Sequence, residues 1–196
     1  THLRLNRTLI ALRERRRIRA REIVRRLSER GVELSYEKLE QKTRHGSIGR
    51  AHIAAALVEE EYVPTFQDAF TRYLGTDNKL MEGIESEKLT PEEAIQLILD
   101  AGGVPVMAHP SKTNRDDLIP MLVDHGLKGI ELYCHGHSTS CFHRYKDMAK
   151  RYGLLHGGGA DFHVKREDAR YSPGSLRIPY EILEKVRDAR DRVCVN

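Results

Sequence analysis

Three residues near the ends of predicted strands could together bind a metal ion. His109 follows the apolar run Val104–Ala108, and Asp161 and His163 follow the run Leu154–Gly158. Asp161 and His163 are two residues apart, so on an extended segment their side chains point the same way. Imidazole nitrogen with carboxylate oxygen suits zinc, manganese or iron better than calcium. We therefore predict that His109, Asp161 and His163 bind one divalent ion or two neighbouring ions.

Each of these residues also has an ordinary structural explanation. A single histidine at a strand end is more often a hydrogen-bonded structural residue than a ligand. Pro110 restricts His109 to an extended conformation, whatever its role. The metal prediction therefore depends on all three residues lying at strand ends in one sheet.

Strands and helices alternate in the second half of the chain. The apolar runs already named and Gly129–Cys134 are predicted strands, and helices are predicted over 91–101, 116–125, 140–152 and 179–192. Alternation with short loops implies βαβ units and a parallel sheet. Chemistry in such sheets gathers at the carboxyl ends of the strands. Each predicted strand ends in a polar cluster, and His137 belongs to the one after Gly129–Cys134.

The first 75 residues look like a small all-helical unit. Helices are predicted over 7–30, 36–42, 49–61 and 65–74. Residues 75–88 are polar and irregular, which is typical of a linker. We therefore predict two regions, a helical region with its linker over 1–88 and an α/β region over 89–196.

Composition and charge are typical of a soluble globular protein. Apolar residues make up 39% of the chain and charged residues 32%, with a formal net charge of +4. Basic residues concentrate in Arg13–Arg30, which predicts either an anionic partner or a solvated helix face paired with nearby glutamates. The three cysteines form no CxxC motif, and no apolar run could span a membrane. A cytoplasmic location is expected.

Longer motifs resemble the PHP (polymerase and histidinol phosphatase) superfamily of metal-dependent phosphoesterases. They are GGVPVMAHP at Gly102–Pro110, GIELYCHGH at Gly129–His137 and LLHGGGADFH at Leu154–His163. The order and spacing of these motifs resemble those in one branch of the superfamily, the nucleoside bisphosphate phosphatases and RNA 5′-end exonucleases. GRAHIAAALVE at Gly49–Glu59 and RRRIRAREI at Arg15–Ile23 resemble the helical insert of that branch.

The resemblance implies a partial distorted (β/α) barrel of PHP type with an all-helical insert. It places divalent metal ions (Mn, Zn, Fe or Mg) at His109, Asp161 and His163. The implied substrate is a phosphorylated nucleotide or a short RNA, hydrolysed by metal-activated water. Planar guanidinium groups suit phosphate, and the implied substrate-binding residues are Arg16, Arg19, Arg50, His52 and His137. A buried structural role for His52 is the alternative.

The chain also departs from the family pattern. The family opens with an HxH strand, an Asp, a His and a Glu-bearing strand, and none of these precedes the segment that aligns with Arg7. We therefore expect the 196-residue chain to be weakly active or inactive alone, with the N-terminal segment or another chain completing the barrel. The alternative is a non-catalytic nucleotide- or RNA-binding module with a degenerate metal site.

Other catalytic classes lack their motifs. No GxSxG elbow accompanies Ser111, and the glycines at Gly157–Gly159 are not followed by the lysine of a phosphate-binding loop. A helix-turn-helix over Gly31–Glu61 is the alternative that would bind DNA, but no helix rich in base-reading residues stands out there.

Overall fold

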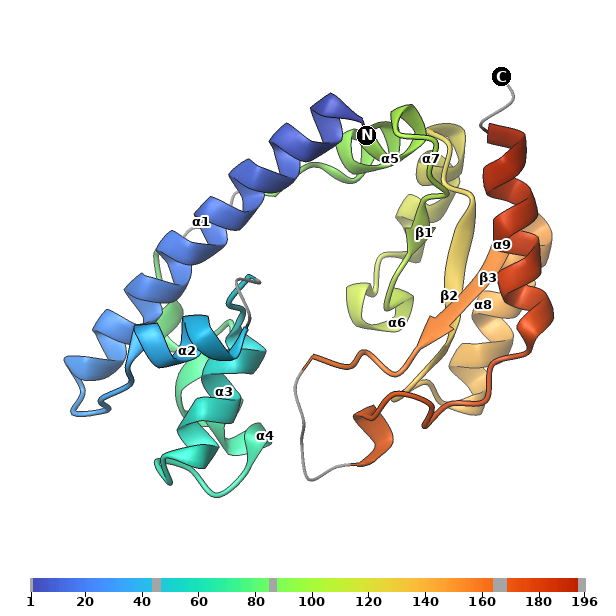
Figure 1. Cartoon of the computed structure of the whole chain (residues 1–196). Coiled ribbons are helices and arrows are strands. Elements are labelled where there is room, and N and C mark those ends of the chain that lie inside the picture. Colours follow the sequence, from blue (N-terminus) through green and yellow to red (C-terminus); the bar gives the residue numbers. More distant parts are fainter. Residues whose placement is uncertain (1, 44–46, 85–87, 164–168, 194–196) are drawn as a thin grey trace. The chain divides into compact units, whose positions relative to one another are not determined.

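The structure is a computed structural model that describes residues 2–43, 47–84, 88–163 and 169–193. The chain divides into two compact units (Figure 1). A helical unit comprises Asn6–Lys88 with His163–Arg166, and an α/β unit comprises Thr1–Leu5, Leu89–Phe162 and Glu167–Asn196.

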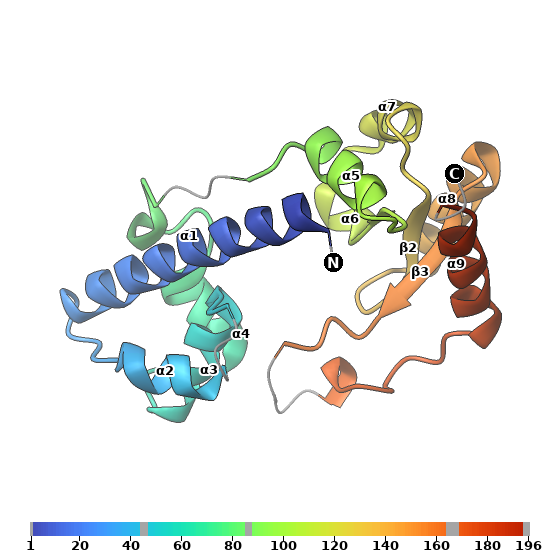
Figure 2. The same cartoon turned by 45° about the horizontal axis from the view of Figure 1, so that its top comes forward.

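Four α-helices form most of the helical unit. They are α1 (Leu3–Ser28), α2 (Tyr36–Lys42), α3 (Arg50–Glu59) and α4 (Phe66–Ala69), followed by a π-helical turn (Phe70–Leu74) and a 3₁₀ turn (Lys79–Met81). Local sequence sets where the short helices begin, since the hydroxyls of Ser35 and Thr65 accept hydrogen bonds from the backbone N–H groups of Lys38 and Asp68. Figure 2 shows α2, α3 and α4 gathered against the C-terminal half of α1.

The core of the helical unit draws on segments far apart in sequence. Leu27 of α1, Leu57 of α3 and Leu80 of the 3₁₀ turn are all fully buried. The guanidinium of Arg26 donates hydrogen bonds to the backbone carbonyls of Leu80, at 2.9 Å, and of Glu82. Leu80 therefore belongs to the core of the helical unit, within the stretch 75–88 for which the sequence predicts a linker.

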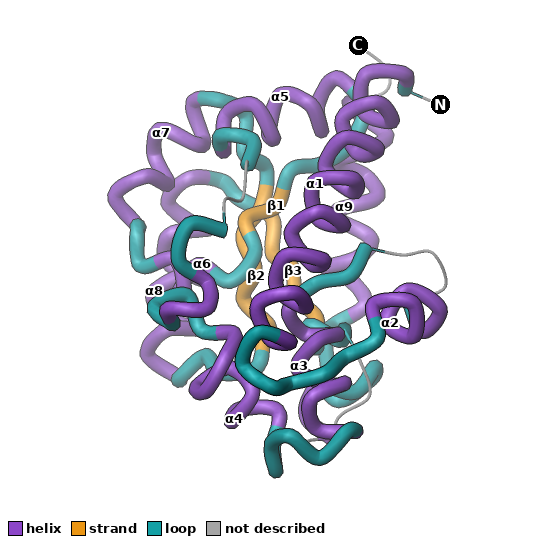
Figure 3. Tube along the Cα trace, turned by 90° about the vertical axis from the view of Figure 1, so that its left-hand side faces the viewer, coloured by secondary structure: helices purple, strands orange, loops and turns teal. Residues whose placement is uncertain are grey.

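The α/β unit alternates helices and strands as the sequence predicts. Its larger elements are α5 (Pro91–Asp100), β1 (Val106–Met107), α6 (Pro110–Thr113), α7 (Ile119–Asp124), β2 (Gly129–Cys134), α8 (Thr139–Tyr152), β3 (Leu155–Gly159) and α9 (Tyr180–Val193). Short 3₁₀ turns cover Asp116–Leu118 and Ala169–Tyr171. Among the described residues the strands form one parallel sheet in the order β1-β2-β3, seen side by side in Figure 3.

Helices cover this sheet and bury its apolar side chains. Ile130 and Leu132 of β2 share a core with Tyr145 and Ala149 of α8. In the view of Figure 1, α8 lies behind the sheet and α9 lies in front of it, beside β3. This packing fixes the strands and therefore the loops at their carboxyl ends. The α/β class is confirmed.

The pairing of β2 with β3 contains a β-bulge at Leu132. Glu131 pairs with Gly157, whereas Tyr133 pairs with Gly158 and Cys134 with Gly159. One extra residue on β2 therefore stands between Glu131 and Tyr133, which reverses the usual alternation of side chains beyond it.

Two local predictions about the site segments are wrong. His109 is not extended but lies in the left-handed region, with φ 48° and ψ 50°. Asp161 also has a positive φ, of 52°, and it lies beyond the end of β3 at Gly159. The extended geometry from which we predicted that the Asp161 and His163 side chains share a face is therefore absent at Asp161. Within the described residues, none of the helices is both long enough and apolar enough to cross a membrane.

Candidate functional site

His109 is held against Glu131 by its backbone and its ring. Its backbone N–H donates a 2.8 Å hydrogen bond to Oε2 of Glu131, and the same oxygen lies 3.1 Å from its Nδ1. The ring contact lacks the alignment of a hydrogen bond, so the buried Nδ1 has no hydrogen-bond partner among the described residues. Glu131 is 12% exposed, which makes it the more buried of the two side chains.

Asp161 faces the other ring nitrogen of His109. Its Oδ1 lies 3.5 Å from Nε2, and the two side chains are about equally exposed, at 31% and 29%. Two of the three predicted metal ligands therefore lie within reach of one ion. Both occupy left-handed backbone, which costs a non-glycine residue about 1 to 3 kcal/mol and is concentrated at functional sites.

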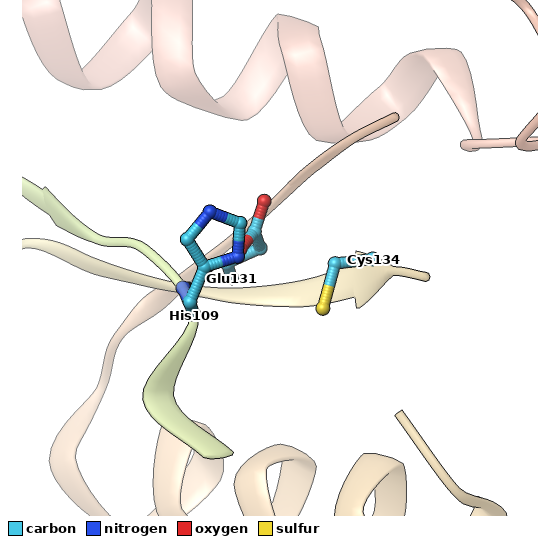
Figure 4. Close-up of side chains that lie close together, drawn as sticks. All are labelled: His109, Glu131 and Cys134. Carbon is cyan, nitrogen blue, oxygen red and sulfur yellow. Dashed lines mark hydrogen bonds and ion pairs between the residues drawn. The ribbon is translucent and has the colours of Figure 1, made fainter. Parts of the chain in front are cut away.

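Cys134 joins His109 and Glu131 in a compact group of possible ligands. One ligand atom from each residue lies within 4.8 Å of the others (Figure 4). Glu131 and Cys134 are three residues apart and would point to opposite faces of a regular strand. The bulge at Leu132 makes them equivalent to residues two apart, since they pair with Gly157 and Gly159. Burial, followed by the charge of Glu131, raises the pKa of Cys134 to about 11.

His137 packs beside the same strand. Its Nδ1 donates to the backbone carbonyl of Leu132 at 3.1 Å, and its ring stacks on Tyr145 with centroids 5.7 Å apart. Its buried Nε2 has no hydrogen-bond partner among the described residues. His137 is therefore held in place by the hydrogen bond of Nδ1, and its Nε2 is available to bind another group.

In the helical unit, two of the predicted arginines act on the third, Arg19. Burial lowers the pKa of Arg19, and the charges of Arg50 and then Arg16 lower it further. Arg50 also donates a 3.0 Å hydrogen bond to the Leu74 carbonyl, and the buried Nε of Arg19 has no hydrogen-bond partner in the described part of the chain. A bound anion would stabilise this arrangement, because it would neutralise the positive charges around Arg19 and accept a hydrogen bond from the buried Nε.

His52 is half-buried at the start of α3, where it has a structural role. Its Nδ1 accepts a 3.1 Å hydrogen bond from the backbone N–H of Gly49, which caps α3. Burial, followed by the charge of His163, lowers the pKa of His52. His163, the third predicted metal ligand, therefore groups with His52 in the helical unit.

The sequence-based prediction missed Glu131 and Cys134. Glu131 is the one charged residue of the otherwise apolar segment GIELYC, and a carboxylate inside a largely buried strand is a signal that could have identified it. No comparable signal marked Cys134, because the bulge cannot be read from the sequence.

Comparison with characterised proteins identifies relatives. The chain is 31% identical to a phosphoribosyl 1,2-cyclic phosphate 1,2-diphosphodiesterase from Eggerthella lenta, over 71% of this chain and 53% of that protein. It is 33% identical to a 3′,5′-nucleoside bisphosphate phosphatase from Chromobacterium violaceum, over 63% of this chain and 44% of that protein. It is 30% identical to a 5′-3′ exoribonuclease from Haemophilus influenzae, over 78% of this chain and 56% of that protein. The chain thus spans about half the length of these relatives.

Two solved structures are similar to this chain in fold and in sequence. A crystal structure from Bifidobacterium adolescentis, provisionally assigned as a metal-dependent phosphoesterase, matches with a TM-score of 0.80 and 26% identity, over 92% of this chain and 64% of the other. An amidohydrolase from Chromobacterium violaceum with bound sulfate matches with a TM-score of 0.76 and 27% identity, over 92% and 65%. No protein-family model matches the chain. The resemblance found in the sequence motifs is confirmed.

Proposed function

Because this chain is related to PHP-type phosphoesterases, we propose that it forms part of an enzyme that hydrolyses phosphate esters of nucleotides or short RNA. The observation that carries this proposal is the 3.5 Å approach of His109 Nε2 to Asp161 Oδ1 beyond the carboxyl ends of parallel strands. In parallel α/β folds this edge of the sheet is where catalytic groups converge.

His109, Asp161 and His163 are the proposed metal ligands. Imidazole nitrogen and carboxylate oxygen suit Mn, Zn or Fe, and Mg fits the carboxylate. The Asp161 carboxylate, 3.5 Å from Nε2 of His109, supports a cation here. A bound divalent ion would supply activated water and charge stabilisation at the phosphoryl oxygens. Glu131 contributes by accepting the hydrogen bond from the His109 backbone and by placing its charge 3.1 Å from the ring, as carboxylates do near metal-binding histidines.

Arg16, Arg19, Arg50 and His52 are the proposed phosphate-binding residues of the helical unit. Arginine forks donate paired hydrogen bonds to phosphate oxygens, which would offset the repulsion that the charges of Arg50 and Arg16 exert on Arg19. Sulfate, a phosphate mimic, is bound by the amidohydrolase relative. His137 is proposed to contact substrate through its unpartnered Nε2.

We further propose that the α/β unit is part of a distorted (β/α) barrel, with a helical insert and linker over 1–88 and the barrel portion over 89–196. The chain spans about half of its relatives, and β1 has only two residues. An N-terminal segment or another chain would supply the remaining strands and metal ligands.

The test uses the intact gene product and the 196-residue chain in parallel. Both are assayed with Mn²⁺ on a 3′,5′-nucleoside bisphosphate and on a 5′-phosphorylated short RNA. We expect activity from the intact product, its loss in His109→Ala and Asp161→Ala, and little activity from the chain alone. An intact product that is metal-free and unaffected by these substitutions would refute the proposal. Nucleotide affinity that survives chelation without any hydrolysis would instead favour a binding module.

A further inference from the structure

One side of the His109 ring carries a group of ligand atoms that is not part of the proposed His109–Asp161–His163 metal site. His109 Nε2 is turned toward Asp161, whereas Nδ1 is turned toward Glu131. Nδ1, a Glu131 carboxylate oxygen and Cys134 Sγ all lie within 4.8 Å of one another (Figure 4). The ring therefore faces acidic partners on both sides, and only one side includes a sulfur.

We propose that His109 Nδ1, Glu131 and Cys134 form a separate binding site for a thiophilic divalent cation, of which Zn²⁺ is the best fit. Thiolate, imidazole and carboxylate are all common zinc ligands, and a thiolate disfavours magnesium and calcium. The buried Nδ1 has no hydrogen-bond partner in the described residues, so a cation there would satisfy it.

The geometry needs only a small contraction. Bond lengths of about 2.0 to 2.3 Å place the donors of a tetrahedral zinc site roughly 3.3 to 3.8 Å apart. Donors within 4.8 Å of one another therefore have to close by about 1 Å, which side-chain rotation can supply. Solvent would complete the coordination shell, because all three residues are only partly buried.

The bulge at Leu132 is what creates this group. It places Glu131 and Cys134 on the same face of β2, in register with Gly157 and Gly159. On binding, the thiol proton of Cys134 passes to solvent and the sulfur enters the coordination shell as thiolate. A neutral imidazole has one free lone pair, so a cation on Nδ1 leaves the proton on Nε2. Occupation of this site is therefore incompatible with a metal bound to Nε2, and excess zinc would inhibit the proposed enzyme.

The inference rests on the proposed function only through the shared His109, and its test needs no hydrolysis assay. The folded 196-residue chain is titrated with Co²⁺, which substitutes for zinc and gives a sulfur-to-cobalt charge-transfer band when a thiolate is bound. We expect one Co²⁺ per chain with this band in the unmodified protein and in Cys141→Ser. We expect loss of the band and roughly a tenfold or greater loss of affinity in Cys134→Ser.

A second measurement uses the unmodified chain, so that a folding defect in Cys134→Ser cannot decide the result. Saturating Zn²⁺ should protect Cys134, but not the free Cys141 of α8, from alkylation mapped by mass spectrometry. A charge-transfer band that persists in Cys134→Ser, the absence of any band in the unmodified chain, or equal alkylation of Cys134 with and without Zn²⁺ would each overturn the proposal. Failure of the phosphoesterase assay would leave all three readouts intact.

Discussion

One carboxylate oxygen of Glu131 contacts both the backbone and the ring of His109. It accepts a 2.8 Å hydrogen bond from the His109 N–H and lies 3.1 Å from Nδ1 of the same residue. Because His109 occupies left-handed backbone, this carboxylate holds a residue that would otherwise relax to a more favourable conformation. The orientation of the proposed metal ligand therefore depends on a residue of the neighbouring strand.

Glu131→Gln should weaken metal binding without unfolding the α/β unit. The amide keeps the shape and can still accept the backbone hydrogen bond, but it loses the negative charge beside the ring. Loss of such a supporting carboxylate lowers metal affinity by about 10- to 100-fold. Isothermal titration with Mn²⁺ on the intact gene product measures the change. Glu181→Gln, at an exposed position of α9, is the matched control, and equal affinities of the two variants would contradict the role of Glu131.

Inorganic phosphate should stabilise the helical unit through Arg19. A ligand present at tenfold excess over its Kd adds about 1.4 kcal/mol to the free energy of unfolding, which raises Tm by several degrees. Arg19→Met should abolish this rise because it removes the half-buried guanidinium on which the charges of Arg50 and Arg16 act. Thermal unfolding with and without phosphate is the measurement. Arg13→Met, exposed on the same helix, should retain the rise, and the same loss in both variants would count against a specific site.

Gly158→Ala should destabilise the α/β unit, whereas Gly159→Ala should be nearly neutral. A Cβ at Gly158 would lie 2.5 Å from both the Cβ and the carbonyl oxygen of Tyr133, opposite the bulge, while a Cβ at Gly159 meets nothing within 4 Å. Overpacking of this kind costs about 1 to 3 kcal/mol. Urea unfolding of the two variants measures the difference. Equal midpoints of the two variants would contradict the close approach of β2 and β3 at Gly158 and Tyr133.

Glu22→Gln should remove part of the acid sensitivity of the helical unit. Hydrogen bonds from Arg25 and Arg26 lower the pKa of Glu22 from 4.5 to about 2. Between these two values the unfolded chain binds a proton that the folded chain does not, so stability is fully present above pH 4.5 and is lost as the pH falls toward 2. The variant should show a shallower decline in Tm over this range, with Glu14→Gln on the same helix as the control. An identical decline in both variants would exclude Glu22 as a contributor.

The sequence by itself determined the local structure and most of the proposed ligands. Capping hydroxyls, glycine stops and apolar periodicity predicted α2 and β2 at their observed bounds, and the bounds of α5, α8 and β3 within one residue. These features act over a few residues, so they can be read from the chain. His109 and Asp161 were predicted from their place after apolar runs, for the same reason.

Only the tertiary structure decided which side chains lie beside His109 and Asp161. The bulge at Leu132 depends on the pairing of β2 with β3, and it brings Cys134 onto the face of Glu131. The left-handed conformation of His109 is supported by a carboxylate 22 residues away, although Pro110 alone favours an extended chain. Contacts between residues distant in sequence overrode local preference at both points, because burial and hydrogen bonding across strands outweigh the conformational bias of a single residue.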